Sequence, residues 1–371
     1  MERIFVIGAG SWGTTLAVLL GEKNYKVTLW ARRKELAEDI NETRENEQYL
    51  KGIKIPETVT ATNSIESISG SNIIVIAVPS KFFRETIRLF SSHISSDSIV
   101  MHAIKGFEGA TGKRISDVLS QETPDAKKVA VMSGPNHSQE VARKIPTATV
   151  IASRNKEVRD YLCKIFSTPY FKPYPHDDVI GVEICGAIKN IVAMAIGVCD
   201  GLKLGDNSKG SIVTLGLTEM SAIAKASGAK MTTCYGLAGI GDLVATCYSR
   251  HSRNRFVGEM LAKGKSIDEI KKEMHGMVAE GLDNAKIAYD ICKRNKINAP
   301  LIHHSYKVLH EGMDIKEAVS QLLCSINKRP KAVQKSSIGC VLTHRLASTT
   351  MEIVGLQKSV QEMYNIIRRN R

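Results

Sequence analysis

Hydrophobic residues in the first half of the chain are gathered into short continuous runs. These runs are separated by helical patterns and occupy residues 4–7, 26–30, 72–78, 98–103, 128–132 and 147–151. Strands that are apolar on consecutive residues are typical of parallel sheets covered by helices on both faces, whereas strands of an antiparallel sandwich alternate. The pattern predicts an α/β fold with a doubly wound, mainly parallel sheet.

The pattern changes after residues 169–175, a segment that holds three prolines. Long helical stretches rich in Ala, Leu, Ile and Lys follow it. We therefore predict one domain over residues 1–178 and a second domain over residues 179–340.

A separate apolar stripe predicts an additional C-terminal helix over residues 341–371. Its members recur at intervals of three and four residues: Ile353, Leu356, Val360, Met363 and Ile367. Such a helix either packs on its own domain or pairs with a second subunit in a homodimer. Two heptads are too few to specify a coiled coil, so both interpretations stand.

The net charge of +13 favours anionic partners, namely nucleic acid, acidic lipid or phosphorylated small molecules. Aromatic residues make up only 5% of the chain, and no nucleic-acid-reading module is present, so we expect no nucleic acid partner. The eight cysteines are scattered without metal-ligand spacing, which indicates reduced thiols and no metal. No segment approaches the ~20 apolar residues of a membrane span, so we expect a cytoplasmic protein without membrane insertion.

Gly8, Gly10 and Gly13 form a Gly-x-Gly-x-x-Gly motif directly after the first strand and before a helix over 14–20. The first glycine allows a tight turn, the second lets the backbone approach a pyrophosphate, and the third lets the helix pack on the strand. The helix N-terminus then offers N–H groups to the anion. Motif and context together predict a Rossmann-like dinucleotide-binding domain.

Arg32 and Arg33 stand at the end of the second strand, where an NAD-selective site would place a carboxylate. Two guanidinium groups at this position can pair with a 2′-phosphate, which favours NADP(H) over NAD(H). The alternative is that both arginines are solvated loop charges.

Lys189 lies in a helical stretch whose other residues are nearly all small or apolar. Desolvation disfavours the ammonium and lowers its pKa, which suits a group that gives a proton to a carbonyl oxygen. The alternative is a lysine whose stem covers apolar surface while its head reaches water.

A second polar cluster combines Gly239-Ile240-Gly241-Asp242-Leu243 with Ser252-Arg253-Asn254. A guanidinium with neighbouring neutral donors is a good clamp for phosphate, although the same tripeptide often marks a helix cap. Lys105-Gly106 and Gly134-Pro135 follow the fourth and fifth apolar runs, where open parallel sheets place their ligand loops.

Together these motifs closely resemble those of the bacterial-type NAD(P)-dependent glycerol-3-phosphate dehydrogenases over nearly the whole chain. The matching segments are Gly8 to Gly13, Lys105-Gly106, Ser133-Gly134-Pro135, Glu183 to Asn190, Gly236 to Asp242, Ser252-Arg253-Asn254 and Val278-Ala279-Glu280-Gly281. The resemblance implies an all-α second domain and the interconversion of dihydroxyacetone phosphate and sn-glycerol 3-phosphate with NAD(P)(H). Such an enzyme would supply glycerol 3-phosphate for glycerophospholipid synthesis.

The resemblance also implies roles for individual residues. Lys189 would be the catalytic proton acceptor in the oxidative direction, with Asp242 and Lys105 beside it. The substrate would be held by Lys105, Gly134, Asn136, Lys189, Asp242, Ser252, Arg253 and Asn254. The cofactor would contact Gly8, Gly10, Ser11, Trp12, Gly13, Arg32, Arg33, Lys105, Ser138, Arg253, Val278 and Glu280.

The chain departs from the family pattern at two places. The family continues Gly-Pro with Ser or Thr, an aromatic residue and Ala, whereas this chain has Asn136, His137 and Ser138. The family pattern also tends to end near residues 329–331, so the helix expected over 341–371 receives no role from it.

Two competing functions remain distinct from this interpretation. Another β-hydroxyacid-type dehydrogenase would share the domains and the helix-borne lysine but use a carboxylate substrate, and the Ser252-Arg253-Asn254 clamp favours a phosphate instead. A nicotinamide-sensing binding protein would need neither Lys189 nor Asp242, and both are present.

Overall fold

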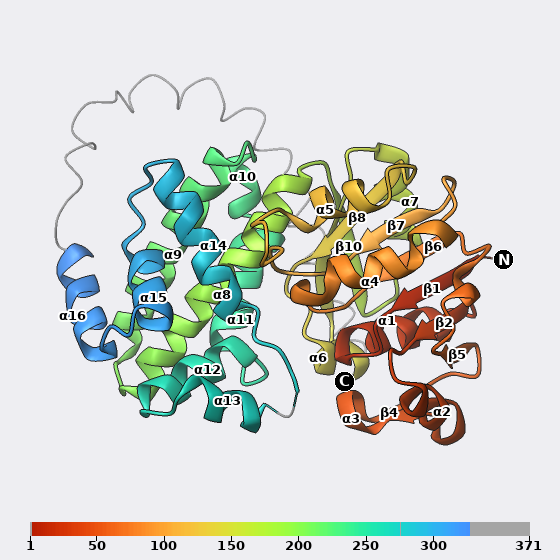
Figure 1. Cartoon of the computed structure of the whole chain (residues 1–371), viewed down its shortest axis with the longest axis horizontal. Coiled ribbons are helices and arrows are strands. Elements are labelled where there is room, and N and C mark those ends of the chain that lie inside the picture. The colour runs from red at the N-terminus through yellow and green to blue at the C-terminus, as the bar shows by residue number, and fades with distance from the viewer. Residues whose placement is uncertain (1, 275, 327–371) are drawn as a thin grey trace, which may run out of the picture. The chain divides into compact units, whose positions relative to one another are not determined.

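The computed structural model describes residues 2–274 and 276–326 (Figure 1). Residues 1–325 form one unit and residues 326–371 another. The stripe expected over residues 341–371 lies outside the described residues.

The first half forms an eight-stranded sheet in the order β10-β9-β8-β7-β6-β1-β2-β5. All six runs predicted from the sequence are strands, and their bounds are confirmed to within a few residues. The strands of this sheet are β1 (Arg3–Ile7), β2 (Lys26–Trp30), β5 (Val59–Thr62), β6 (Ile73–Ile76), β7 (Ile99–His102), β8 (Lys128–Ser133), β9 (Thr147–Ala152) and β10 (Phe171–His176).

Two strands of this sheet were not predicted from the sequence, and one of its strand pairs is antiparallel. The sequence pattern missed β5 and β10, and the latter carries Pro173 and Pro175. Proline is tolerated there because β10 is an edge strand, which pairs only with β9. The β8–β9 pair is antiparallel, whereas the other pairs of this sheet are parallel, so the sheet is mainly parallel.

The strand order reverses between β1 and β6, which both run parallel and lie side by side. In open α/β sheets the crevice outside the carboxyl ends of two such strands is the usual ligand site. The glycine motif follows β1, so the topology brings it to this crevice.

Both faces of the sheet are buried, as the continuous apolar runs predicted. Ile4 and Val6 belong to one core cluster, whereas Phe5 and Ile7 belong to a second cluster on the opposite face. Figure 1 shows the helices that flank the strands in this half. These helices are α1 (Ser11–Glu22), α2 (Lys34–Thr43), α4 (Phe83–Phe90), α5 (Ile115–Glu122), α6 (Ser138–Ala142) and α7 (Lys156–Phe166), with α3 (Glu47–Leu50) beside a small hairpin of β3 (Glu45–Asn46) and β4 (Lys51–Lys54).

The second half is helical over its described residues, as the resemblance implied. Its helices are α8 (Val179–Gly201), α9 (Asp206–Ala226), α10 (Met231–Cys234), α11 (Asp242–Tyr248), α12 (Arg253–Ala262), α13 (Ile267–Glu273), α14 (Gly281–Arg294), α15 (Pro300–His310) and α16 (Ile315–Ile326), and a π-helical turn, Leu237–Gly241, precedes α11.

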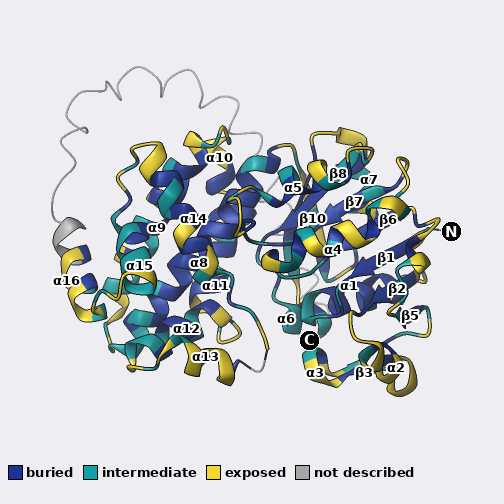
Figure 2. Cartoon of the chain, in the orientation of Figure 1, coloured by how far each residue is buried: buried dark blue, intermediate teal, exposed yellow. Residues whose placement is uncertain are grey.

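Helix α8 corrects one expectation from the sequence. Its 23 residues have a mean hydropathy of 1.8 in the most apolar window, so by length and composition it is apolar enough to cross a membrane. The rest of the structure buries 83% of that window, and Figure 2 shows α8 in the colour of buried residues. A helix that is buried on all sides in a protein core is also long and apolar, so its length and composition alone do not indicate a membrane span.

Two glycines bring α8 and α12 into close contact. A Cβ atom at Gly197 would lie 1.9 Å from the Arg255 carbonyl oxygen, and one at Gly258 would lie 1.9 Å from the Met194 carbonyl oxygen. The backbones therefore touch, and this contact fixes the start of α12 relative to the helix that carries Lys189.

Candidate active site

The glycine loop has the local geometry that the motif predicts. Gly8 has φ +112°, a conformation that residues with a side chain rarely adopt, and a Cβ at Gly13 would lie 1.8 Å from the Gly8 carbonyl oxygen. At Gly10 a Cβ would meet nothing within 4 Å, because this glycine faces open space. No side chain of the described residues caps the N-terminus of α1, so its N–H groups remain available to an anion.

A cavity of about 710 Å³ begins at this loop and extends between the sheet and the helical half. Gly8, Gly10, Ser11 and Trp12 line it at the sheet side, and the indole Nε1 of Trp12 is buried without a hydrogen-bond partner among the described residues. A cavity of this size, with an uncapped helix N-terminus and an unpaired donor, fits a dinucleotide.

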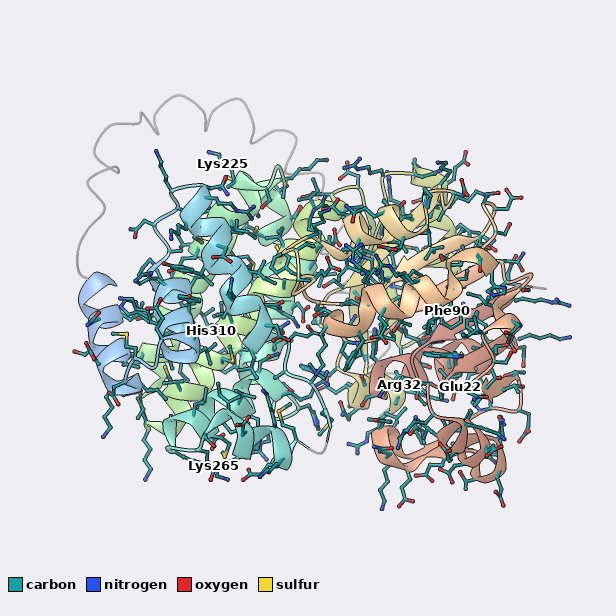
Figure 3. The ribbon with its side chains drawn as sticks, viewed as in Figure 1. Glu22, Arg32, Phe90, Lys225, Lys265 and His310 are labelled. Atoms are coloured by element: carbon teal, nitrogen blue, oxygen red, sulfur yellow. The ribbon has the colours of Figure 1, made fainter. Side chains whose placement is uncertain are left out.

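Arg32 and Arg33 both line this cavity. The Arg32 guanidinium lies 5.6 Å from the Phe82 ring centroid, and Arg33 donates a hydrogen bond to the Gln48 side chain. Figure 3 labels Arg32 on the sheet-bearing half. Both arginines therefore lie where a cofactor phosphate can reach them, and their contact with it stays a prediction.

The far part of the cavity reaches Lys189, which is only 4% exposed. Its Nζ donates to Asp242 Oδ1 at 2.6 Å and to Thr246 Oγ1 at 2.7 Å. An ammonium carries three N–H groups, so one has no acceptor among the residues that the structure describes. This helix thus holds a desolvated lysine with one free donor, rather than one that reaches bulk water.

The pKa of Lys189 is lowered to about 7, and desolvation by burial is the main cause. The charge of Asp242 opposes this effect, and the charge of Lys105 adds to it. Burial alone would raise the pKa of Asp242, but the ammonium groups of Lys105 and Lys189 hold that pKa below its ordinary value. The site therefore keeps an ionised carboxylate beside a lysine whose proton is exchangeable near neutral pH.

Lys105 lies on the other side of the same carboxylate. Its Nζ donates to Asp242 Oδ2 at 2.9 Å, to the Gly134 carbonyl at 2.7 Å and to Asn136 Oδ1 at 2.7 Å. The structure therefore brings together four residues that the sequence proposed for the substrate site, although they are far apart in the chain.

The predicted phosphate clamp lies at the start of α12. Ser252 caps this helix by accepting from Arg255 N at 3.2 Å, and both Ser252 and Arg253 line the cavity. Arg253 is exposed and forms no hydrogen bond or ion pair with residues 2–274 and 276–322. A helix N-terminus with an unpaired guanidinium is well suited to a phosphate dianion.

Asn254 has a different environment from Arg253. Its side chain donates to Asn190 Oδ1 at 2.9 Å and accepts from Gly281 N at 2.9 Å, while Asn190 donates to the Lys105 carbonyl at 2.9 Å. Asn254 thus joins α12, α8 and α14, and its substrate contact stays a prediction.

Glu280, Val278 and Ser138 also line the cavity. The Glu280 carboxylate accepts from Ser80 N at 2.9 Å and from the Ser80 hydroxyl, which links α14 to the segment after β6. Cofactor contacts of these three residues stay predictions.

Sequence reasoning missed Thr246 and Asn190, which line the cavity, and Ser80, which donates to the cavity-lining Glu280. Thr246 had a visible signal, since it follows Asp242 by one helical turn and so shares its face. Ser80 donates to Glu280, 200 positions later in the chain, and no pattern among neighbouring residues predicts such a contact. In the described part of the chain, no group of three His, Cys, Asp or Glu side chains could hold a metal ion.

The fold and the site define a class of protein: a dinucleotide-dependent oxidoreductase whose cavity ends at a buried lysine and carboxylate. Models of two domains of the NAD-dependent glycerol-3-phosphate dehydrogenase family match the chain, the N-terminal one over residues 3–159 and the C-terminal one over residues 178–320. The chain therefore belongs to the NAD-dependent glycerol-3-phosphate dehydrogenase family, which confirms the resemblance stated from the sequence.

Individual relatives agree with this assignment. Glycerol-3-phosphate dehydrogenase [NAD(P)+] of Chlorobium limicola is 43% identical over 324 residues, which cover 86% of this chain and 97% of that protein. The enzyme of the same name from Moorella thermoacetica is 41% identical over 337 residues, 91% of this chain and 98% of that protein. The crystal structure of glycerol-3-phosphate dehydrogenase from Coxiella burnetii superimposes with a TM-score of 0.83 at 36% identity, covering 87% of this chain and 98% of that chain.

Proposed function

We propose that the chain catalyses the reversible reduction of dihydroxyacetone phosphate to sn-glycerol 3-phosphate, with NAD(P)H as the hydride donor. The observation that carries this proposal is the buried Lys189, which donates hydrogen bonds to Asp242 and Thr246. It lies in the same cavity as Arg253, which forms no hydrogen bond or ion pair with the described residues. This combination offers a proton donor for a ketone oxygen and a cation for a phosphate.

Lys189 protonates the ketone oxygen during reduction and accepts the same proton during oxidation. Asp242 and Thr246 hold two of its N–H groups, so the third is left to point at the substrate. A pKa of about 7 permits both directions near neutral pH, because neither protonation state is strongly disfavoured. Asp242 orients the ammonium and balances its charge.

Arg253 and the N-terminus of α12 bind the phosphate of the substrate, and Ser252 contributes its hydroxyl. A guanidinium presents two parallel N–H groups to phosphate oxygens, and the first N–H groups of the helix point in the same direction. A carboxylate substrate would offer fewer acceptors to this set, so the site favours a phosphate ester.

When bound, the cofactor supplies the hydride, and the glycine loop with α1 binds its pyrophosphate. Arg32 and Arg33 favour NADP(H) over NAD(H), because a 2′-phosphate is the ligand group that two cavity-lining guanidinium groups at this position would pair with.

We assign cofactor binding to residues 1–178 and substrate binding to residues 179–340, since β10 ends at His176 and α8 begins at Val179. We further propose a cytoplasmic enzyme that supplies glycerol 3-phosphate for glycerophospholipid synthesis. A homodimer that involves residues 341–371 is one of the two interpretations of the apolar stripe there.

A spectrophotometric assay tests the reaction. Absorbance of the reduced nicotinamide should fall with dihydroxyacetone phosphate and stay constant with 3-oxo acids, and NADPH should give the higher kcat/KM of the two reduced cofactors. Turnover of a 3-oxo acid with none of dihydroxyacetone phosphate would contradict the proposal and favour a carboxylate-specific dehydrogenase.

A further inference from the structure

The three N–H groups of Lys105 are all occupied. They are directed at the Gly134 carbonyl, Asn136 Oδ1 and Asp242 Oδ2, at 2.7, 2.7 and 2.9 Å. A lysine ammonium has three donors and no acceptor, so Lys105 has none left for a ligand. Lys189 differs, because only two of its three donors have partners in the described part of the chain.

The hydrogen bonds around Asn136 fix which way its amide points. Thr149 Oγ1 donates to the Ser133 carbonyl at 3.0 Å, and Asn136 Nδ2 donates to Thr149 Oγ1 at 3.0 Å. Because the only hydrogen of the Thr149 hydroxyl goes to Ser133, that oxygen is left as an acceptor and must face the NH₂ group of the amide. The amide oxygen of Asn136 is therefore turned toward Lys105, which needs an acceptor.

This network is well buried, so its bonds are difficult to exchange for water. Thr149 is fully buried and Asn136 is 7% exposed. Gly134 has φ +140°, and a Cβ there would lie 2.9 Å from Thr149 Oγ1, so the turn packs directly on the threonine. Hydrogen bonds in such an interior restrict the groups they join more firmly than hydrogen bonds at the surface.

We propose that Asn136 is a positioning residue, which holds Lys105 as a fixed cation beside Asp242, and that it does not bind the substrate. The proposal rests on the proposed role of Lys189 as proton donor, since Lys105 and Lys189 both donate to the carboxylate of Asp242. A serine or threonine at this position would have a shorter side chain without a carbonyl oxygen to place against Lys105.

A fixed cation at Lys105 has a defined effect on Lys189. The charged and titratable groups that act on Lys189 are Asp242 from α11 and Lys105 from the loop after β7, and those on which it acts include His137 after β8 and Cys247 from α11. The charge of Lys105 lowers the pKa of Lys189, so a new negative charge beside Lys105 should raise that pKa.

Two variants separate positioning from substrate contact. In Asn136→Ser the acceptor for Lys105 is lost, and we expect kcat to fall about tenfold, as for loss of one charge-assisted hydrogen bond, while KM for dihydroxyacetone phosphate stays within about twofold. In Asn136→Asp the added carboxylate should move the alkaline limb of kcat for ketone reduction to higher pH. A purely structural role would not confine the loss in Asn136→Ser to kcat.

Asn41→Ser is the matched control. Asn41 also bridges two elements through its amide, by donating to the Ala61 carbonyl and accepting from Ala61 N, both at 2.8 Å, and it does not line the cavity. It should lower the melting temperature without a change in kcat, KM or the pH profile. Thr149→Val provides a second perturbation of the Asn136 amide if an Asn136 variant does not fold, and it should lower kcat in the same direction.

Three outcomes would contradict the proposal. A rise in KM with unchanged kcat and pH profile in both Asn136 variants would show a substrate contact and overturn the proposal. Turnover lost in Lys189→Met but unaltered in the Asn136 and Thr149 variants would refute this inference alone. Turnover retained in folded Lys189→Met would refute the proton-donor assignment and this inference with it.

Discussion

Replacing Arg253 by alanine should impair use of dihydroxyacetone phosphate far more than binding of the cofactor's adenosine end. Arg253 lines the cavity and forms no hydrogen bond or ion pair with residues 2–274 and 276–322, although the charge of Glu280 acts on it. Its loss therefore breaks no described ion pair within the protein, and the effect reports on ligand binding.

The size of the effect follows from the hydrogen bonds that a guanidinium makes to phosphate. A hydrogen bond to a charged group contributes ~1.5–3 kcal/mol, and the fork makes two such bonds with partial overlap of their energies. We expect a loss of about 3 kcal/mol in kcat/KM for dihydroxyacetone phosphate, which corresponds to roughly 150-fold.

The assay compares kcat/KM for the ketone phosphate and KM for NADPH in wild type, Arg253→Ala and Arg253→Lys. The lysine variant should recover part of the loss, because it restores the charge without the fork. Arg255→Ala is the control: Arg255 bonds to Asp200 at 2.5 Å, so its loss should lower stability without a comparable change in KM. Unchanged kinetics in Arg253→Ala would refute the clamp.

Three further predictions concern the cofactor, pH and the C-terminus. The double variant Arg32→Ala, Arg33→Ala should have a lower NADPH-to-NADH ratio of kcat/KM than wild type. A ratio equal to that of wild type would show that the two arginines do not select the cofactor. Burial raises the pKa of Glu219 from 4.5 to about 7, so the folded state retains a proton that the unfolded chain releases, and stability should decline by about 3 kcal/mol as pH rises from 4.5 to 7. Denaturant titrations at pH 5 and pH 8 check this against Glu219→Gln, and the same pH dependence in both proteins would contradict it. Truncation after Cys340 should change the solution mass or the melting temperature, and a truncated protein equal to wild type in both and in activity would show that residues 341–371 are dispensable.

The features that the sequence predicted well depend on local backbone geometry or on the immediate neighbours along the chain. Gly8 and Gly13 are required by a turn and a helix contact within six residues of each other, so their spacing alone is informative. Lys189 was predicted to be desolvated because its helix is apolar, and it is 4% exposed. Its catalytic role stays a prediction.

The features that the sequence missed depend on contacts between distant segments. The sequence pattern did not predict strand β10, which carries Pro173 and Pro175, and only its place at the sheet edge makes those prolines acceptable. The orientation of the Asn136 amide depends on Thr149, thirteen positions later. The Thr149 hydroxyl donates its hydrogen to the Ser133 carbonyl and therefore accepts from the amide. Composition and periodicity do not predict such a hydrogen bond.

The most direct test of the central claim is the single-turnover rate of ketone reduction in Lys189→Met, measured at saturating NADPH and dihydroxyacetone phosphate. Methionine keeps much of the stem volume of the lysine and removes the ammonium, so packing on α8 is largely retained and the proton donor is lost. General acid–base catalysis contributes roughly 10²–10⁴-fold, and we predict a rate lower by about that factor with NADPH affinity near that of wild type. A folded Lys189→Met protein that reduces dihydroxyacetone phosphate at the wild-type rate would contradict the account.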